Sequence, residues 1–225
     1  MTVGSGSLKS VSVSVGVATG LYGISFGALG ATAGLDIYQT VALSIFMFSG
    51  GSQFAFIGVL ASGGIGSLPA AVTSSWLLGV RNGFYALSLA PILKLSGFRR
   101  VLGAQLTIDE SAAVSTSRES HSEQVKGFWF TGISVFVFWN IATGLGFLLG
   151  NSIGDPKQFG LDAAAAAALF ALVWPRLLNL LGGFVGVVAL VSAVILVPLL
   201  PPGMPVLAAA VLAVGFGTLI SRWIK

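Results

Sequence analysis

Residues 67–93 read SLPAAVTSSWLLGVRNGFYALSLAPIL, and Arg81 is the only charged side chain among them. Ser74 and Ser88 stand seven residues to either side of Arg81, and Ser67 stands fourteen residues before it. All four therefore lie close to one face of a helix. A guanidinium keeps its charge at physiological pH, and lipid does not solvate it. We expect this face to look into protein, water or an anionic ligand.

The composition of the whole chain is typical of an integral membrane protein. Hydrophobic residues make up 55% of the 225 residues and charged residues only 8%, with a mean hydropathy of +0.96. A bilayer core of about 30 Å needs roughly 20 apolar residues in a helix, and the chain has several uncharged runs of that length. These runs are continuously apolar rather than alternating, which argues against a membrane β-barrel. The expected fold class is an all-α membrane protein.

About seven transmembrane helices fit these runs, with six as the alternative. The expected spans are 11–34, 38–62, 66–93, 127–153, 161–181, 183–200 and 204–222. They divide the chain into a polar tail at 1–9, a three-helix unit at 10–93, a polar loop with a short helix at 94–126, and a unit of about four helices at 127–222. Pro175 and Arg176 would break or tilt the fifth span.

The distribution of charge predicts the orientation in the cell membrane. Half of the chain's eighteen Asp, Glu, Lys and Arg residues lie in the loop 94–126. The positive-inside rule then places this loop and the C-terminus in the cytoplasm, and Lys9 outside. The net charge of +4 is spread over span ends, so no nucleic-acid partner is expected. The chain has no cysteine, and neither a metal nor a cofactor is expected.

A weak internal repeat is visible. Thr19-Gly20-Leu21 recurs as Thr143-Gly144-Leu145, and Gly34-Leu35-Asp36 recurs as Gly160-Leu161-Asp162. Because three spans precede the polar loop, a second copy would start from the opposite side of the membrane, as in the inverted repeats of secondary transporters. This predicts a 3+3 inverted repeat with a seventh helix appended. The alternative is a chance match in a chain with 31 glycines.

The first expected span is rich in glycine. Its glycines alternate at spacings of four and three residues and fall on one face: Gly16, Gly20, Gly23, Gly27, Gly30 and Gly34. A face without side chains lets another helix approach closely. The alternative is that the helix unwinds around Gly27 and offers backbone groups to a ligand.

The second expected span contains the sequence FSGGSQF at 48–54. Its paired glycines weaken a helix, and the amide of Gln53 at membrane depth needs hydrogen-bond partners or water. One interpretation is a structural bond between helices. The other is a helix break or a ligand contact that involves Ser49, Gly50 and Gln53.

Arg81 has two interpretations. It is either a structural cation held by carbonyl or hydroxyl oxygens, or it binds a carboxylate, to which its planar guanidinium offers two parallel donors. Asn82 and Tyr85 lie close enough along the helix to complete such a site. Asn140, in the span 127–153, could oppose Arg81, although inward packing of polar residues explains Asn140 equally well.

The acidic residues near the spans are explained first by helix capping. Asp36 with Gln39 fits a capping box, and Thr107 with Glu110 fits another that opens a short helix in the loop. The alternative for Asp109 and Glu110 is a part in proton coupling. The chain lacks the motifs of zinc proteases and phosphate-binding loops, so an enzyme is not expected.

Together these motifs resemble the AzlC family of branched-chain amino-acid permeases, which is linked to azaleucine resistance. The resemblance rests, in order along the chain, on Phe26-Gly27, residues 48–54, Arg81 through Tyr85 to Ser88-Leu89-Ala90-Pro91, and Asp109-Glu110. The family's motif at the arginine is Asn-x-Arg-His, whereas this chain has Gly79-Val80-Arg81-Asn82. The arginine is kept, but its polar neighbours differ, which bears on the substrate and on any proton step that uses histidine.

The resemblance implies a secondary transporter that exports branched-chain or other hydrophobic amino acids, driven by an ion gradient. Valine, leucine, isoleucine and methionine are the candidate substrates, and Arg81 would bind their carboxylate. The resemblance also implies a small membrane subunit of the AzlD type as a partner. The alternatives are an anion-selective channel or pore, and a structural subunit of a membrane complex in which Arg81 holds helices together.

Overall fold

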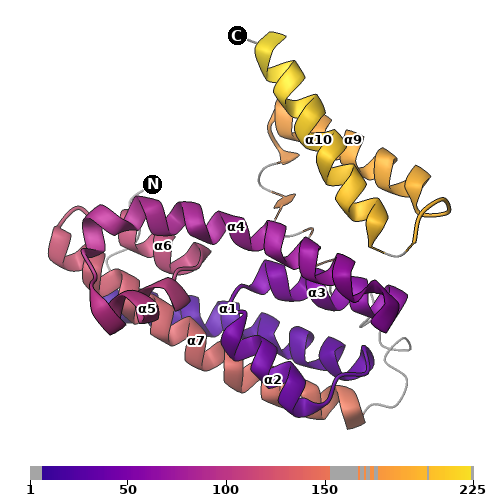
Figure 1. Ribbon diagram of the computed structural model, residues 1–225. Coiled ribbons are helices and arrows are strands. Elements are labelled where there is room, and N and C mark those ends of the chain that lie inside the picture. Colours follow the sequence, from indigo (N-terminus) through magenta and orange to yellow (C-terminus); the bar gives the residue numbers. More distant parts are fainter. Residues whose placement is uncertain are drawn as a thin grey trace.

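All regular structure in the described part of the chain is helical in the computed structural model (Figure 1). The structure describes residues 7–152, 167, 170, 173–174, 177–201 and 203–223. The helices are α1 (Leu8–Thr32), α2 (Ile37–Phe46), α3 (Gly50–Gly63), α4 (Leu68–Leu93), α5 (Gly97–Gln105), α6 (Asp109–Thr116), α7 (His121–Ser152), α9 (Leu180–Leu196) and α10 (Met204–Trp223), with a 3₁₀ turn at Ile65–Ser67. The all-helical expectation is confirmed for these residues. Most of the expected span 161–181 lies outside them.

Helices α1 and α7 form the central pair of the fold. Ser12 Oγ lies 2.9 Å from Thr131 Oγ1 near the start of both helices, and Ala28 meets Gly150 near their ends. The two helices therefore run in the same direction. Their approach is so close that a Cβ atom at Gly27 would collide with α7, which is the packing that the glycine face predicts. Helix α1 is continuous through Gly27.

Helices α2 and α3 are two arms of a hairpin rather than one span. α2 starts near the C-terminal end of α1, where Thr40 packs on Gly30, and the chain is non-helical at residues 47–49. α3 then returns along α4 toward the end from which α2 came (Figure 1). We call residues 37–63 the first hairpin. The expectation that residues 38–62 form one membrane-crossing helix is therefore wrong. An apolar run of this length also fits a hairpin of two shorter helices that enters and returns.

The expected polar loop 94–126 contains a second hairpin, formed by α5 and α6. Its tip residue Leu106 packs on Gly132, in the middle of α7, whereas Val114 packs on Gly127, near the start of α7. This hairpin therefore enters from the end opposite to the first hairpin. We call residues 97–116 the second hairpin. Its tip is buried at Leu106, Thr107 and Ile108.

The tips of the two hairpins meet in the middle of the molecule. The side-chain amide of Gln105, at the end of α5, donates a hydrogen bond to the carbonyl oxygen of Ile45, near the end of α2.

Asp36 and Gln39 form the expected capping box at the base of the first hairpin, with Gln39 N donating to Asp36 Oδ1 at 2.8 Å. In the second hairpin, Ser111 rather than Thr107 makes the side-chain bond at the start of α6.

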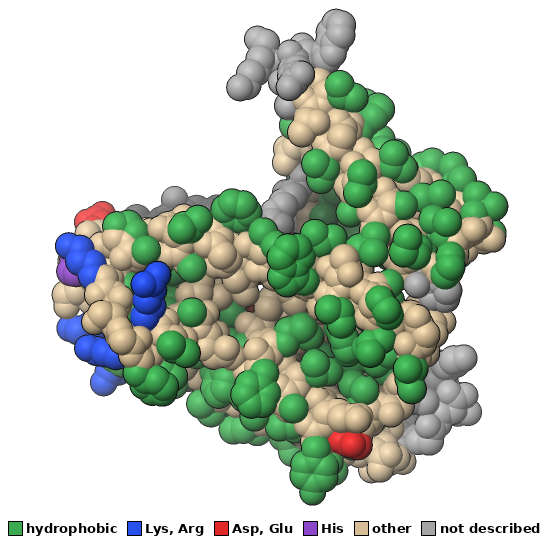
Figure 2. Space-filling view, in the orientation of Figure 1, with side chains coloured by type: hydrophobic (Ala, Val, Ile, Leu, Met, Phe, Trp, Pro, Cys, Tyr) green, Lys and Arg blue, Asp and Glu red, His purple; other side chains and the backbone are tan. Residues whose placement is uncertain are grey.

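The structure changes the expected orientation of the N-terminus. Lys9 Nζ lies 5.7 Å from the centre of the Phe130 ring, so the start of α1 and the start of α7 share one end of the molecule. Lys9 and the loop 94–126 therefore cannot face opposite sides of a membrane. The reason is that the chain turns back in the first hairpin and returns along α4 to the end at which α1 begins. Figure 2 shows Lys and Arg side chains gathered at one end of the molecule.

The same geometry bears on the expected 3+3 inverted repeat. A second copy that begins at α7 would have to run opposite to the first copy, but α1 and α7 run in the same direction. The structure does not have this relationship, and the match at 160–162 lies outside the described residues. The match of residues 19–21 with 143–145 is therefore not the mark of an inverted repeat.

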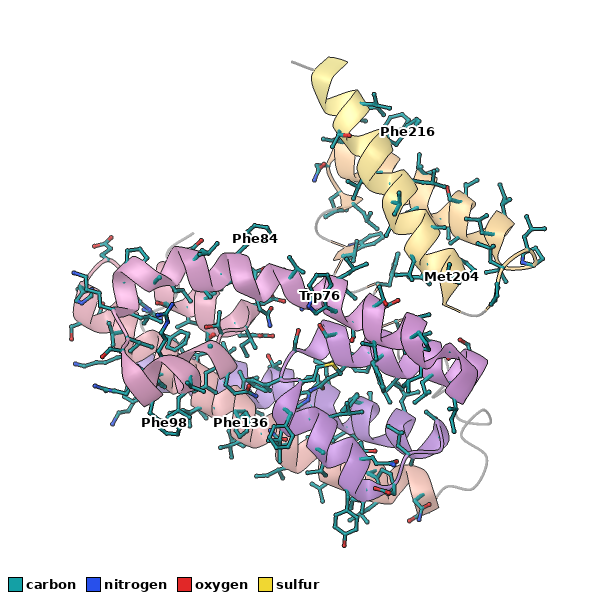
Figure 3. The ribbon with its side chains drawn as sticks, in the orientation of Figure 1. Trp76, Phe84, Phe98, Phe136, Met204 and Phe216 are labelled. Atoms are coloured by element: carbon teal, nitrogen blue, oxygen red, sulfur yellow. The ribbon has the colours of Figure 1, made fainter. Side chains whose placement is uncertain are left out.

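The remaining surface is strongly apolar. Among the described helices, α1 and α7 are long and apolar enough to cross a membrane. Helices α9 and α10 pack on each other, and Gly203, just before α10, touches Val59 and Ala70. Trp76 and Phe84 are largely exposed on α4, and Phe84 projects away from α7 (Figure 3). Such a surface fits a protein that is surrounded by lipid.

Candidate ligand-binding site

A cavity of about 180 Å³ lies where the hairpin tips meet the long helices. Its polar lining comes from α1, α4 and both tips: Thr19, Ser49, Arg81, Asn82, Asp109 and Glu110. Its apolar lining is mainly aromatic and branched: Tyr22, Phe48, Phe54, Ile108, Val135 and Trp139. A few convergent polar groups beside an apolar wall are typical of a site for a small amphiphilic molecule.

Arg81 forms an ion pair with Asp109 in this cavity. Arg81 Nη2 lies 3.1 Å from Asp109 Oδ2, and the two side chains are 23% and 31% exposed. Asp109 is the first residue of α6, where the helix dipole favours a negative charge. A Cβ atom at Gly51 would lie 2.9 Å from Arg81 Nη2, so the glycine lets the guanidinium lie against the first turn of α3. Arg81 of α4 thus contacts both hairpin tips.

Four residues that line the cavity have a buried polar atom without a hydrogen-bond partner in the described part of the chain. They are Ser49 (Oγ), Arg81 (Nε), Asn82 (Oδ1) and Asp109 (Oδ1). The hydroxyl and the guanidinium nitrogen can donate, whereas the amide and carboxylate oxygens accept. Buried polar atoms are seldom left unpaired. The set therefore matches a ligand that has both hydrogen-bond acceptors and hydrogen-bond donors.

The start of α3 adds further donors. Ser49 is the N-cap residue of α3, and its side chain makes no capping bond. The first N–H groups of a helix have no partner within the helix, and together with the helix dipole they favour an anion. Gly50 and Gly51 line the cavity at this helix start and leave its backbone open to a ligand.

Glu110 is the second acidic group of the site. It lies in α6, a helix of eight residues that is not one of the long apolar helices. Burial raises the pKa of Glu110, and the neighbouring Asp109 carboxylate adds to the rise, while a backbone hydrogen bond, Arg81 and Thr19 act in the opposite direction. The protonated form of Glu110 therefore persists to a higher pH than that of an exposed glutamate.

Gln53 has a structural role in the hairpin tip. It is fully buried, its Nε2 donates to the Met47 carbonyl oxygen at 2.8 Å, and its Oε1 accepts from Trp139 Nε1 at 2.8 Å. These bonds satisfy a backbone group that the helix break frees, and they hold the indole in place. The Trp139 ring also packs against Phe26 and Phe54, with centroids 6.5 and 6.3 Å away.

The structure brings together Ser49, Gly50, Arg81, Asn82, Asp109 and Glu110, all of which the sequence suggests. Four other candidates do not line the cavity: Gly27, Gln53, Tyr85 and Asn140. Gly27 faces α7, Tyr85 packs at the edge of the hydrophobic core, and Asn140 Nδ2 donates to the Phe136 carbonyl oxygen at 2.8 Å.

The serine stripe is only partly inward-facing. Ser67 and Ser74 are buried, but Ser88 is exposed and donates to the carbonyl oxygen of Phe84 at 3.0 Å. Sequence reasoning missed five lining residues: Thr19, Tyr22, Ile108, Val135 and Trp139. Thr19 could have been found from its place between the glycines of α1, but no pattern in the sequence singles out Trp139.

Among the described residues, no group of three or more His, Cys, Asp or Glu side chains is placed to hold a metal ion. Comparison with known families shows that residues 14–153 match the family described as AzlC protein. The match includes both hairpins and every residue that lines the cavity. No curated protein and no solved structure matches the chain.

Proposed function

We propose that this chain, which belongs to the AzlC family, is a secondary membrane transporter that exports branched-chain and other hydrophobic amino acids. The family supports a function in branched-chain amino-acid transport, and the apolar helices fit a membrane protein. The observation that carries the proposal is the cavity with two unpartnered donors and two unpartnered acceptors. An amino acid is a zwitterion, with an acceptor carboxylate and a donor ammonium, and it complements this set.

The substrate carboxylate binds between Arg81 and the start of α3. Arg81 offers charged donors, and Ser49 with the N–H groups at Gly50 and Gly51 offers neutral ones. The ammonium lies toward Asp109 and the amide oxygen of Asn82. The aliphatic side chain then contacts the apolar lining of the cavity. Valine, leucine, isoleucine and methionine all have side chains of this kind.

Binding exchanges the partners of Arg81 rather than leaving any charge unpaired. Without substrate, Arg81 and Asp109 neutralise each other. With substrate, Arg81 takes the carboxylate and Asp109 takes the ammonium, so each charge in the cavity keeps an opposite neighbour. This exchange matters because an unpaired buried charge costs several kcal/mol, on the order of 3–5.

The proposed orientation follows from the shared end of α1 and α7. Lys9 joins the basic residues of the loop 94–126 at that end, and the positive-inside rule places it in the cytoplasm of the cell. The second hairpin then faces the cytoplasm and the first faces outside. A small AzlD-type subunit is the proposed partner, and the lipid bilayer surrounds both.

The ion pair of Arg81 and Asp109 favours a second candidate function, a structural subunit in which Arg81 only ties α4 to the second hairpin. Counterflow in proteoliposomes separates the two. Vesicles loaded with unlabelled leucine should concentrate labelled leucine, valine and isoleucine, with saturation, and the co-expressed small subunit should be tested for its effect. Leucinamide and 3-methylbutylamine, which lack the carboxylate, should not drive counterflow. Absence of exchange for every amino acid supports the structural role, and uptake without saturation supports a pore.

A further inference from the structure

The chain from α1 to α6 is built from two units of the same plan. The long helices α1 and α4 start at Leu8 and Leu68, 60 residues apart. The first arms of the hairpins, α2 and α5, start at Ile37 and Gly97, also 60 residues apart. The second arms, α3 and α6, start at Gly50 and Asp109, 59 residues apart. One long helix followed by one hairpin is thus repeated at an almost constant offset.

The connections between the elements repeat as well. Gly34 and Lys94 follow the two long helices, are 60 residues apart, and both have positive φ, at 82° and 47°. Lys94 is the only non-glycine residue with positive φ in the described part of the chain. A lysine in this conformation is uncommon, so its match to Gly34 indicates a shared backbone plan. The next caps, Asp36 and Ser96, are again 60 residues apart.

The two units run in opposite directions. The first hairpin has its base at the C-terminal end of α1, where Thr40 packs on Gly30. The second has its base at the N-terminal end of α1, where a Cβ atom at Gly127 would lie within 3.6 Å of both Val114 and Leu8. In addition, α3 packs along the following long helix α4, and α6 packs along the following long helix α7. The units are therefore inverted copies, with α7 closing the second.

Each unit brings the same feature to the cavity. α3 and α6 both begin there, so the N-termini of two returning helices converge on one site from opposite sides. Ser49, at the start of α3, has its buried hydroxyl unpartnered. Arg81 lies against Gly51 of the first tip and pairs with Asp109 of the second. Arg81, on α4, thus contacts both hairpin tips.

We propose that the two hairpins are alternating gates of the transporter, with the first opening the cavity to one side of the membrane and the second opening it to the other. The inference rests on the proposed function. Substrate binding starts the switch between the two gates. The substrate carboxylate pairs with Arg81, and this breaks the ion pair between Arg81 and Asp109 that holds the second tip. When both gates are shut, the hydrogen bond from the Gln105 side chain to the Ile45 carbonyl oxygen joins the two tips. Inverted units that work around a central site are a general route to alternating access.

Cross-linking of introduced cysteines tests the gate proposal. Because the chain has no cysteine of its own, only the introduced thiols can react. In the double variant Ile45→Cys with Gln105→Cys, a short thiol-to-thiol linker ties the two tips. We expect leucine counterflow in the reduced double variant, its loss after cross-linking with a linker that reductant cleaves, and its return on cleavage. The control pair is Ser12→Cys with Thr131→Cys, which joins α1 to α7 and should leave counterflow unchanged when linked. Undiminished counterflow with the tips linked would overturn the gate proposal.

Single-cysteine labelling covers the case in which the double variant does not fold. Thr19→Cys, in the wall of the cavity, should react with a membrane-impermeant thiol reagent added from either side of the vesicle. Reaction from one side only, under every substrate gradient, would contradict two gates. Leucine counterflow by the wild type distinguishes failure of the gate proposal from failure of the proposed function. If the wild type shows counterflow while the gate tests fail, the binding site is retained and the gate proposal is wrong. If the wild type shows no counterflow, the proposed function itself is wrong.

Discussion

Arg81 and Asp109 are joined through a single short contact, with Nη2 of the arginine 3.1 Å from Oδ2 of the aspartate. Arg81 Nε and Asp109 Oδ1 are both buried and have no partner in the described structure. The pair is therefore not the two-bond arrangement that a guanidinium and a carboxylate can make. Each member therefore keeps one buried polar atom that is available to a ligand.

Asp109→Asn should change the preference of the site between ligands. Leucine should bind more weakly, because its ammonium loses a charged partner. In contrast, 4-methylpentanoate, which has the carboxylate and the side chain but no ammonium, should bind more tightly, by roughly two- to fivefold, because Arg81 loses a competing partner. Direct binding to the purified variant checks both affinities. Glu119→Gln, an exposed carboxyl outside the cavity, should change neither. Parallel changes for the two ligands would argue against the proposed pose.

Glu110 should give leucine binding a dependence on pH. Because its pKa is raised, Glu110 stays protonated to a higher pH than an ordinary glutamate and ionises as the pH rises through that raised pKa. The ionised carboxylate then competes with the substrate carboxylate for Arg81, so leucine affinity should fall over this interval. Titration of the affinity against pH checks this for the wild type.

In Glu110→Gln the same interval should be flat, because the amide does not ionise. Glu123→Gln, an exposed carboxyl at the start of α7, should keep the wild-type profile. A profile in Glu110→Gln that matches the wild type would assign the pH dependence to another group.

Trp139→Phe should destabilise the first hairpin. The ring contacts remain, but the buried Gln53 Oε1 loses its donor, and an unsatisfied buried acceptor costs about 1–3 kcal/mol. The unfolding temperature in detergent should fall. Trp76→Phe, at an exposed position on α4, is the matched control and should have little effect. Equal shifts for the two variants would show that the bond to Gln53 contributes nothing measurable.

The close packing of α1 on α7 should depend on particular glycines. A Cβ atom at Gly146 would collide with the Ile24 carbonyl oxygen, whereas one at Gly144 would meet nothing within 4 Å. Gly146→Ala should cost about 1–3 kcal/mol through overpacking. Gly144→Ala should be neutral or stabilising by a few tenths of a kcal/mol, up to about 1, because alanine favours a helix. Thermal unfolding of both variants checks the contrast, and a stable Gly146→Ala protein would contradict the packing.

Much of the site could be predicted from the sequence because charge and polarity are costly in an apolar chain. Arg81 stands out for that reason, and Asn82 lies next to it in the sequence. Asp109 and Glu110 are candidates on separate grounds, as paired carboxylates in the polar loop for which helix capping is the first explanation. The capping box of Asp36 with Gln39 could also be predicted from the sequence, because it depends only on the local spacing of the two residues.

The hairpins were harder to predict. Hydropathy measures how apolar a segment is, and residues 38–62 are as apolar as a crossing helix although the chain turns back at residues 47–49. The second hairpin was hidden for the opposite reason, because its base is polar while its tip at Ile108 is buried. The place of Trp139 depends on tertiary packing against Gln53 and Phe54, which has no signature in the sequence.

The most direct test of the account is the affinity of Arg81→Lys for leucine, measured beside its folding. Lysine keeps the positive charge but loses the planar set of donors, and the loss of hydrogen bonds to a charged group, worth roughly 1.5–3 kcal/mol, corresponds to an affinity about ten- to a hundredfold weaker. Arg100→Lys, an exposed arginine on α5, is the control and should bind as the wild type does. We predict a folded Arg81→Lys protein with this loss. A folded variant with unchanged leucine affinity would contradict the claim that Arg81 holds the substrate carboxylate.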